Sequence, residues 1–310
     1  MKKLVIGLAI VAAVMTALAQ QSSNPFLGRW DFNITTPRGS GAAWIGVTDK
    51  GGKVEVWFQP MGGNVFEVKD FKISGSHLSL TLEPGNNKRR AMTWELDAKD
   101  GKLVGVQKRG EATLALVGVR SPELKRAAPK AWSKPEPLFD GKDLKGWEPI
   151  GDTAHSHWTV ENGLLVNTEH GANLRTTRTF TDFKVHYEVD CPKDGNSGFY
   201  LRGRYEVQIE DEPLSDNPPE RRIGSIYGRI APQPALPRAP GQWQTFDVTL
   251  VGRTVTEVHN GVTVIDHKEI EGITGGAIDA NEGEPGPFYI QGDHTGGLKF
   301  RNITVSVPER

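Results

Sequence analysis

The sequence predicts an all-β protein that folds as two domains. Apolar and polar residues alternate with period two in several segments, among them 53–58, 184–189 and 245–250, which is the pattern of half-buried strands. Turn signals recur at strand-length intervals, and helical periodicity is nearly absent. The clearest turn is Asn260-Gly261, a pair that suits a type I′ hairpin. Strands and tight turns therefore account for most of the chain.

The composition is that of a globular protein without a strong electrostatic field. The chain has 310 residues, and 37% of them are hydrophobic. This length favours two cores over one. The 37 basic and 38 acidic side chains leave a net charge of −1. Such a balance disfavours binding to nucleic acid or to an anionic membrane surface.

The N-terminus has the three parts of a secretory signal peptide. Two lysines follow Met1, an apolar run covers 4–17, and small residues lead to an expected cleavage after Ala19. The run is too short to favour a retained membrane helix. A periplasmic or secreted protein is expected. Cys191 is the only cysteine, so no internal disulfide can form, and a buried position is expected for it.

A linker is expected at 121–136, where proline and charged residues replace the strand pattern. Before it, 24–120 holds about seven or eight short strands. Their opening, with Trp30 after Gly28 and Arg29, resembles a small lipocalin-like or avidin-like barrel. We expect its own side chains to fill this barrel, as in a structural or accessory domain. The second domain is expected to span 137–307.

The densest group of chemically useful side chains lies in 196–211. Alternation directs Phe199 and Ile209 to the core, and it directs five others to the opposite face: Tyr200, Arg202, Glu206, Gln208 and Glu210. An aromatic ring, a guanidinium, carboxylates and an amide together suit a polyhydroxylated ligand. The alternative is the ordinary solvated face of an antiparallel sheet.

A second stretch, 288–303, favours the functional interpretation. A strand is expected to end at Gln291, and a glycine-rich turn then presents Asp293 and His294. Histidine is the side chain that most readily exchanges a proton near neutral pH. The Pro-rich segment 231–240 is expected to be an ordered loop at the rim of the sheet, because proline cannot form a central strand.

Seven motifs in order make the second domain resemble the 3-keto-disaccharide hydrolase domain family. They lie at 138–147, 158–163, 196–211, 224–228, 241–243, 260–261 and 291–303. The resemblance implies a concanavalin-like β-sandwich (jelly roll) that cleaves glycosides already oxidised to a ketone at sugar carbon 3. The ketone would acidify the hydrogen on carbon 2. A base could remove it, the aglycone would leave from carbon 1, and water would then add.

This chemistry requires a base, a group that stabilises the enolate oxygen and an acid. We expect Glu206 or His294 to be the base, Arg202 with Gln208 to stabilise the oxyanion, and Asp211 or His294 to be the acid or orienting group. Substrate contacts are expected from five residues: Asn196, Tyr200, Tyr227, Gln291 and Arg301. Arg301 could equally be a structural ion-pair residue.

Several alternatives remain open from the residues alone. Glu206 and Asp211 could act as the paired carboxylates of an ordinary glycosidase. The sandwich could bind sugar without catalysis, or serve as an exported scaffold. A divalent cation (Ca, Mg or Mn) is compatible with the enolate chemistry, zinc at His155 and His157 lacks a third ligand, and the acidic run 210–212 lacks a calcium-loop spacing. A sugar 3-dehydrogenase is the expected supplier of the ketone.

Overall fold

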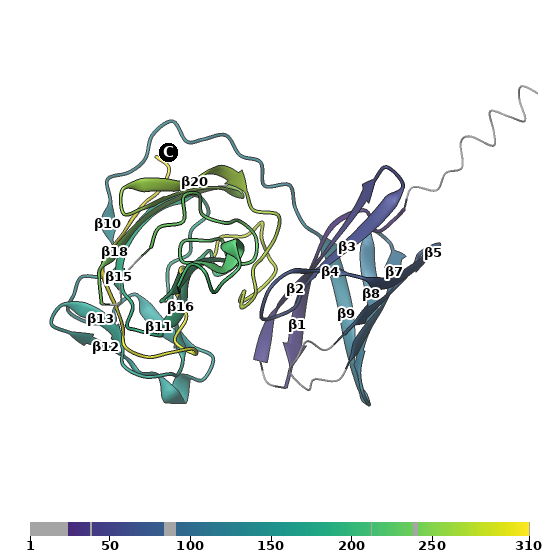
Figure 1. The fold of residues 1–310 in the computed structure, drawn as a ribbon, viewed down its shortest axis with the longest axis horizontal. Coiled ribbons are helices and arrows are strands. Elements are labelled where there is room, and N and C mark those ends of the chain that lie inside the picture. Colours follow the sequence, from purple (N-terminus) through teal and green to yellow (C-terminus); the bar gives the residue numbers. More distant parts are fainter. Residues whose placement is uncertain (1–23, 38, 84–90, 212, 238–240, 310) are drawn as a thin grey trace, which may run out of the picture.

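The computed structural model describes residues 24–37, 39–83, 91–211, 213–237 and 241–309. It confirms the all-β prediction, since these residues form strands and two short 3₁₀ helices, η1 (Thr153–His155) and η2 (Pro219–Arg221). Figure 1 shows two bodies, a barrel-like sheet and a sandwich, joined by a long connecting segment. The expected signal peptide lies outside the described residues. No helix among the described residues is long and apolar enough to cross a membrane.

The N-terminal body is a nine-stranded antiparallel sheet that curls into a nearly closed barrel. Its strands run β4-β3-β2-β1-β9-β8-β7-β6-β5 in the sheet. In chain order they are β1 (Gly28–Thr36), β2 (Gly39–Lys50), β3 (Lys53–Gln59), β4 (Phe66–Val68), β5 (Asp70–Ser74), β6 (His77–Leu82), β7 (Met92–Lys99), β8 (Lys102–Arg109) and β9 (Ala112–Arg120). The barrel is therefore complete before the connecting segment begins.

Aromatic side chains fill the middle of the barrel. The Trp94 ring meets the edges of Phe32 and Phe58, with ring centroids 5.0 and 4.9 Å apart. Such edge-to-face contacts stabilise beyond the area that they bury. One end keeps a cavity of about 540 Å³, beside Pro60 and Arg109. Aromatic side chains thus fill the middle of the barrel, and the cavity reaches the Phe58 and Trp94 rings.

The C-terminal body is a sandwich of two antiparallel sheets. The larger sheet runs β12-β13-β22-β15-β18-β19-β20, with β10 added against β22, and the smaller runs β11-β14-β21-β16-β17. The bounds are β10 (Glu136–Pro137), β11 (Trp147–Ile150), β12 (Trp158–Glu161), β13 (Leu164–Asn167), β14 (Asn173–Thr176), β15 (Phe183–Asp190), β16 (Asn196–Leu201), β17 (Tyr205–Glu210), β18 (Gln244–Val251), β19 (Thr254–His259), β20 (Val262–Glu269), β21 (Tyr289–Ile290) and β22 (Leu298–Ser306).

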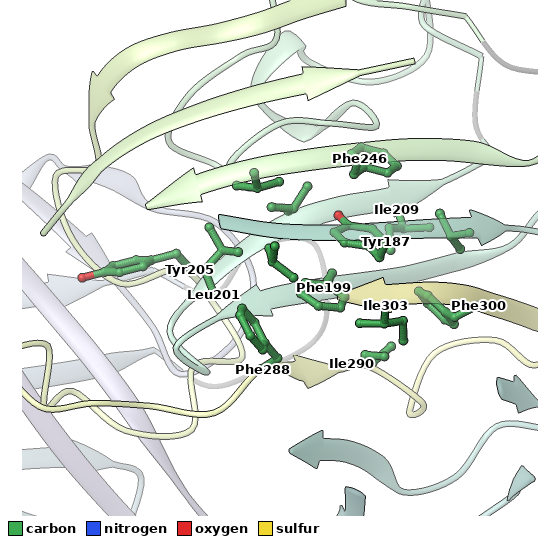
Figure 2. Packing of buried hydrophobic residues seen from close by; sticks show 14 of the residues in the cluster. Tyr187, Phe199, Leu201, Tyr205, Ile209, Phe246, Phe288, Ile290, Phe300 and Ile303 are labelled. Atoms are coloured by element: carbon green, nitrogen blue, oxygen red, sulfur yellow. The ribbon is translucent and has the colours of Figure 1, made fainter. Parts of the chain in front are cut away.

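Stacked aromatic rings join the two sheets of the sandwich (Figure 2). Tyr187 on β15 lies parallel to Phe199 on β16 at 4.1 Å and to Phe246 on β18 at 5.0 Å. Cys191 is fully buried beside this core, as expected from the sequence. The layer between the sheets is mainly apolar, although β19 also buries Glu257 and His259 in it, and the polar face of the smaller sheet points away from it.

Local sequence accounts for the turns. Asn260 and Gly261 both have positive φ, 49° and 77°, as a type I′ hairpin requires. The described part of the Pro-rich segment, 231–237, contains no strand, in agreement with the loop prediction. Of the acidic run considered for calcium, Glu212 lies outside the described residues.

The barrel and the sandwich meet through a packed interface. Trp44 on the outside of the barrel packs against Ile273 and Ala277 of the sandwich. Backbone contact is direct as well, because the Gly276 amide donates to the Met61 carbonyl at 2.8 Å. The segment that contacts the barrel, 272–280, continues across the outer face of the smaller sheet. This places the barrel beside the polar face of that sheet.

Candidate functional site

A row of polar side chains crosses the outer face of the smaller sheet. The strand register aligns one residue from each strand: Glu148 on β11, Arg175 on β14, Tyr289 on β21, Tyr200 on β16 and Glu206 on β17. Their sequence neighbours, such as Phe199 and Val207, belong to the apolar core. The alternation predicted for 196–211 is therefore the one that the structure has, and it extends over five strands.

Glu206 occupies a position that depends on a glycine of the neighbouring strand, Gly198, which lies diagonally across from it. A Cβ atom at Gly198 would lie 2.4 Å from Glu206 Oε1, so the carboxyl group lies flat over β16. The Gly275–Gly276 segment covers the same place, because a Cβ at Gly276 would lie 2.4 Å from Tyr200 Oη. Glu206 is left 4% exposed. The two glycines allow a carboxyl and a phenol to lie in contact beneath a loop.

The hydrogen bonds around Tyr200 indicate where the protons are. Tyr200 Oη lies 2.7 Å from the Gly275 carbonyl oxygen and 2.8 Å from Glu206 Oε2, and the Gln291 amide donates to it at 2.9 Å. A phenol has one proton, and the carbonyl can only accept. All three contacts are hydrogen bonds if Glu206 is protonated and donates to Tyr200. The network therefore favours a neutral carboxylic acid.

The electrostatics agree with this assignment. Burial, and then the nearby charge of Asp293, raise the pKa of Glu206 to about 8, although the hydrogen bond with Tyr200 acts in the opposite direction. Burial likewise raises the pKa of Tyr200 and of Tyr289 well above the ordinary tyrosine value. Both phenols therefore remain protonated near neutral pH. The two phenols and the Glu206 carboxyl group are almost fully buried on this face, and the Gly275–Gly276 segment covers Tyr200.

The pKa of a second carboxyl group, that of Asp293, is lowered instead of raised. Partial burial raises its pKa, but the hydrogen bond and charge of His294, with the amide of Asn173, outweigh burial and hold the pKa below the ordinary aspartate value. Asp293 Oδ1 lies 2.9 Å from His294 Nδ1. Asn173 holds this turn, since its Oδ1 accepts from the backbone amides of Gly292 at 2.7 Å and Asp293 at 3.1 Å. An ionised carboxylate therefore lies near a protonated one.

A cavity of about 460 Å³ opens beside Asp293 and Asn173, and three histidines line its other side: His155, His157 and His170. Gly171 makes this arrangement possible, because a Cβ there would lie 2.0 Å from the His155 carbonyl oxygen. His155 is the last residue of η1 and not a strand residue. Among the described residues, no three His, Cys, Asp or Glu side chains group closely enough to hold a metal ion.

Most of the residues predicted from the sequence lie together. Tyr200, Glu206 and Gln291 form the hydrogen-bonded network, and Gln208 follows Glu206 on the same face, where its amide donates to Glu210 at 3.5 Å. Two more, Asn196 and Tyr227, lie at its margins. The backbone amide of Asn196 donates to the Thr295 hydroxyl oxygen, beside His294. The backbone amide of Tyr227 donates to the Glu206 carbonyl oxygen.

Arg202 does not lie with this group, which corrects the alternation argument at that residue. It lies in the β16–β17 turn with φ 53°, so strand alternation ends before it. Its guanidinium is fully buried and donates to Gly252 at 2.7 Å and to Tyr205 at 3.2 Å, toward the contact with the barrel. Without Arg202, the hydrogen-bond donors near Glu206 are the tyrosine phenols and the glutamine side-chain amides of the same face.

Arg301 and Asp211 also lie outside the network. Arg301 is on β22 of the larger sheet, where it pairs with Glu188 at 2.7 Å and stacks on Trp243 at 3.9 Å. These are the contacts of a structural ion pair, the second of the two interpretations considered for it. Asp211 follows the end of β17, and its carboxylate accepts from the Asp194 amide at 3.2 Å.

Sequence reasoning missed the part of the site contributed by distant segments. Asn173 belongs to a strand that no motif marked as functional, and Tyr289 lies inside the 288–303 stretch but was not among the expected site residues. His157 and His170 reach the cavity from loops on either side of β12 and β13. Only the spacing of His155 and His157 was a visible signal. That spacing is one that zinc ligands can have, and in the structure the two side chains line an open cavity.

Comparison with known proteins agrees with the predicted family. Residues 134–306 match the family model described as the 3-keto-alpha-glucoside-1,2-lyase-like domain. This match confirms the resemblance found in the seven motifs. No curated protein matches the chain.

Solved structures similar to the chain include two candidate glycosyl hydrolases from Parabacteroides distasonis ATCC 8503. One is 29% identical with a TM-score of 0.48, over 59% of this chain and 93% of that chain. The other is 19% identical with a TM-score of 0.46, over 54% of this chain and 91% of that chain. SCLam, a non-specific endo-β-1,3(4)-glucanase of family GH16, is 12% identical with a TM-score of 0.35, over 59% of this chain and 94% of that chain.

Proposed function

Because the chain belongs, through residues 134–306, to the 3-keto-alpha-glucoside-1,2-lyase-like domain family, we propose that it cleaves glycosides oxidised to a ketone at sugar carbon 3. The observation that carries the proposal is the pair of carboxyl groups on one face. Glu206 is held protonated with a pKa of about 8, while the pKa of Asp293 is lowered. Two titratable groups whose pKa values are shifted in opposite directions are the usual sign of an acid and a base in one site.

The proposed reaction starts at the turn that follows β21. Asp293 holds His294 by Nδ1, which leaves Nε2 free to take the proton from carbon 2 of the keto sugar. The electron pair of that C–H bond forms the enolate, and the bond from carbon 1 to the aglycone oxygen breaks. Glu206, positioned by Tyr200, gives its proton to the departing oxygen. Addition of water across the new double bond at carbon 1 then completes a net hydrolysis.

The enolate oxygen requires hydrogen-bond donors because Arg202 lies elsewhere. The amide of Gln291 and the phenol of Tyr289 are the nearest candidates on the polar face, and Gln208 lies one position further along it. Donors aimed at a developing oxyanion contribute several kcal/mol, roughly 3–4 for each, in a site that excludes water. In this proposal the cavity beside Asp293 and Asn173 receives the sugar ring.

The test is to incubate the mature chain with a disaccharide and with its 3-keto derivative, and to follow the released sugar. We expect cleavage of the keto compound alone, and the same rate with a chelator present if no divalent cation takes part. Cleavage of the unoxidised disaccharide would instead indicate a paired-carboxylate glycosidase. Binding without turnover of either compound would reduce the sandwich to a carbohydrate-binding module and overturn the proposal.

Export and coupling to an oxidising enzyme belong to the same proposal. The chemistry requires an enzyme that oxidises carbon 3 of a sugar, so a sugar 3-dehydrogenase is the proposed partner. Residues 1–19 are proposed to direct the chain out of the cytoplasm. N-terminal sequencing of the protein recovered from the periplasm or the medium should begin at Gln20. An N-terminus at Met1 in the recovered protein would contradict this.

A further inference from the structure

A cleft of about 700 Å³ lies where the barrel meets the sandwich, apart from the cavity beside Asp293. On the barrel side it is lined by β1, β2 and β3, and on the sandwich side by Gly228, Arg229, the last residue of β20 and Glu271. None of its lining residues belongs to the Glu206 network or to the histidine-lined cavity. Ligand sites occur preferentially at junctions of this kind. The proposed reaction does not use this cleft.

The barrel side of the cleft is an aromatic floor bordered by a cation. The register places Arg29, Gly46 and Trp57 side by side on three neighbouring strands. Because Gly46 has no side chain, the Trp44 ring lies across it, where a Cβ would come within 2.2 Å of the indole. Trp57 remains 36% exposed. Two strand spacings separate Arg29 from Trp57, or about 10 Å, which is wide enough for a sugar ring.

The sandwich side supplies both hydrogen-bond donors and acceptors. Arg229 stacks on Trp44 at 4.5 Å and donates to the Ile273 carbonyl at 2.7 Å, and it pairs with no carboxylate among the described residues. Burial lowers the pKa of its guanidinium to about 10. The carboxylates of Glu269 and Glu271 line the cleft as well, and Glu269 pairs with Arg29 of the barrel at 3.0 Å. Cations and carboxylates nearly balance across the cleft, so a strongly charged ligand has no advantage there.

We propose that this cleft is a second carbohydrate site, which binds a pyranose unit of an unoxidised oligosaccharide against the Trp57 ring. Sugar hydroxyls both donate and accept, so they match a wall that presents a guanidinium beside carboxylates. The apolar face of the ring suits an indole that is partly open to solvent. Because the site joins barrel to sandwich, it also assigns a role to the N-terminal domain. The inference goes beyond the proposed function and does not depend on it.

The experiment measures binding of four unoxidised tetrasaccharides to the mature chain by isothermal titration calorimetry: cellotetraose, laminaritetraose, maltotetraose and xylotetraose. At least one is expected to bind. Trp57→Ala should weaken that binding about 10-fold, the size of a lost aromatic contact, and Trp57→Phe should restore most of it. Phe66→Ala removes an equally exposed ring, 39% exposed and outside the cleft, and should leave affinity unchanged.

Cleavage of a 3-keto disaccharide is measured on the same variants. Trp57 lies outside the catalytic cavity, so its replacement should leave turnover unchanged, which separates this inference from the proposed function. The absence of binding by all four sugars would overturn the inference. Equal affinity of the wild type and Trp57→Ala would overturn it as well, because the sugar would then bind elsewhere.

Discussion

Replacing Glu206 by glutamine should lower turnover of a 3-keto glycoside by about 10²- to 10⁴-fold, the usual contribution of a general acid or base. Glutamine keeps the shape that fits over Gly198 and can still donate to Tyr200, so the network around the phenol survives. It cannot release a proton to the departing aglycone oxygen. The measurement is kcat on the purified variant, with circular dichroism to confirm that the sheet is intact.

The pH profile distinguishes the acid role proposed for Glu206 from the base role that the sequence had predicted for it. The pKa of about 8 means that the carboxyl is protonated below pH 8 and ionised above it. As the acid, Glu206 must be protonated, so wild-type kcat should fall as pH rises through about 8, and that limb should vanish in Glu206→Gln. If Glu206 is the base, kcat should rise over the same interval. A rising limb would transfer the acid role to His294.

Stability provides an internal check on this assignment. The folded-state pKa lies above the ordinary value of 4.5, so the folded chain binds more protons than the unfolded chain between pH 4.5 and about 8. The contribution of Glu206 to stability is therefore lost as pH rises through that window. Glu206→Gln should flatten this part of the stability curve. Glu148→Gln, the same substitution at the exposed β11 end of the row, should change neither turnover nor the curve.

The strand pattern was predictable because it is local. Alternation in 196–211 placed Tyr200 and Glu206 on one face and Phe199 in the core, and both placements follow from a single strand's own period of two. The prediction for Arg202 was wrong because the same rule was carried into a turn. There the backbone adopts a positive φ, and the side chain points toward Tyr205 and Gly252.

The rest of the site depends on which strands are neighbours, and the sequence does not state that. Asn173 and Asp293 are 120 residues apart, yet the amide of one holds the turn that carries the other. His157 reaches the cavity because Gly171 allows two loops to touch. Such contacts arise from strand register and from close approach at glycines, neither of which leaves a periodic signal in one chain. The family motifs located the domain, whereas these contacts determine its chemistry.

The contact between barrel and sandwich contains a buried charged cluster that should matter for folding. Glu282 is fully buried, accepts a hydrogen bond from Tyr205 at 2.7 Å and lies 3.4 Å from the Arg253 guanidinium. Asp31 of the barrel belongs to the same cluster, since burial and then the charge of Glu282 raise its pKa to about 8. Ser121, from the connecting segment, donates to Asp31 at 2.5 Å. The Glu282 carboxylate therefore interacts with groups of both the barrel and the sandwich.

Replacing Glu282 by alanine should lower the free energy of unfolding by about 3–5 kcal/mol, because it leaves the buried Arg253 charge without a partner. The Tyr205 phenol loses its acceptor as well, and the Asp31 pKa should fall once the neighbouring negative charge is gone. Urea unfolding followed by tryptophan fluorescence measures the effect. Glu284→Ala, two residues along the same loop and exposed, should unfold at the wild-type urea concentration. If both variants match the wild type, the cluster contributes no net stability, and the other contacts between barrel and sandwich, among them the one at Trp44, account for the stability of the interface.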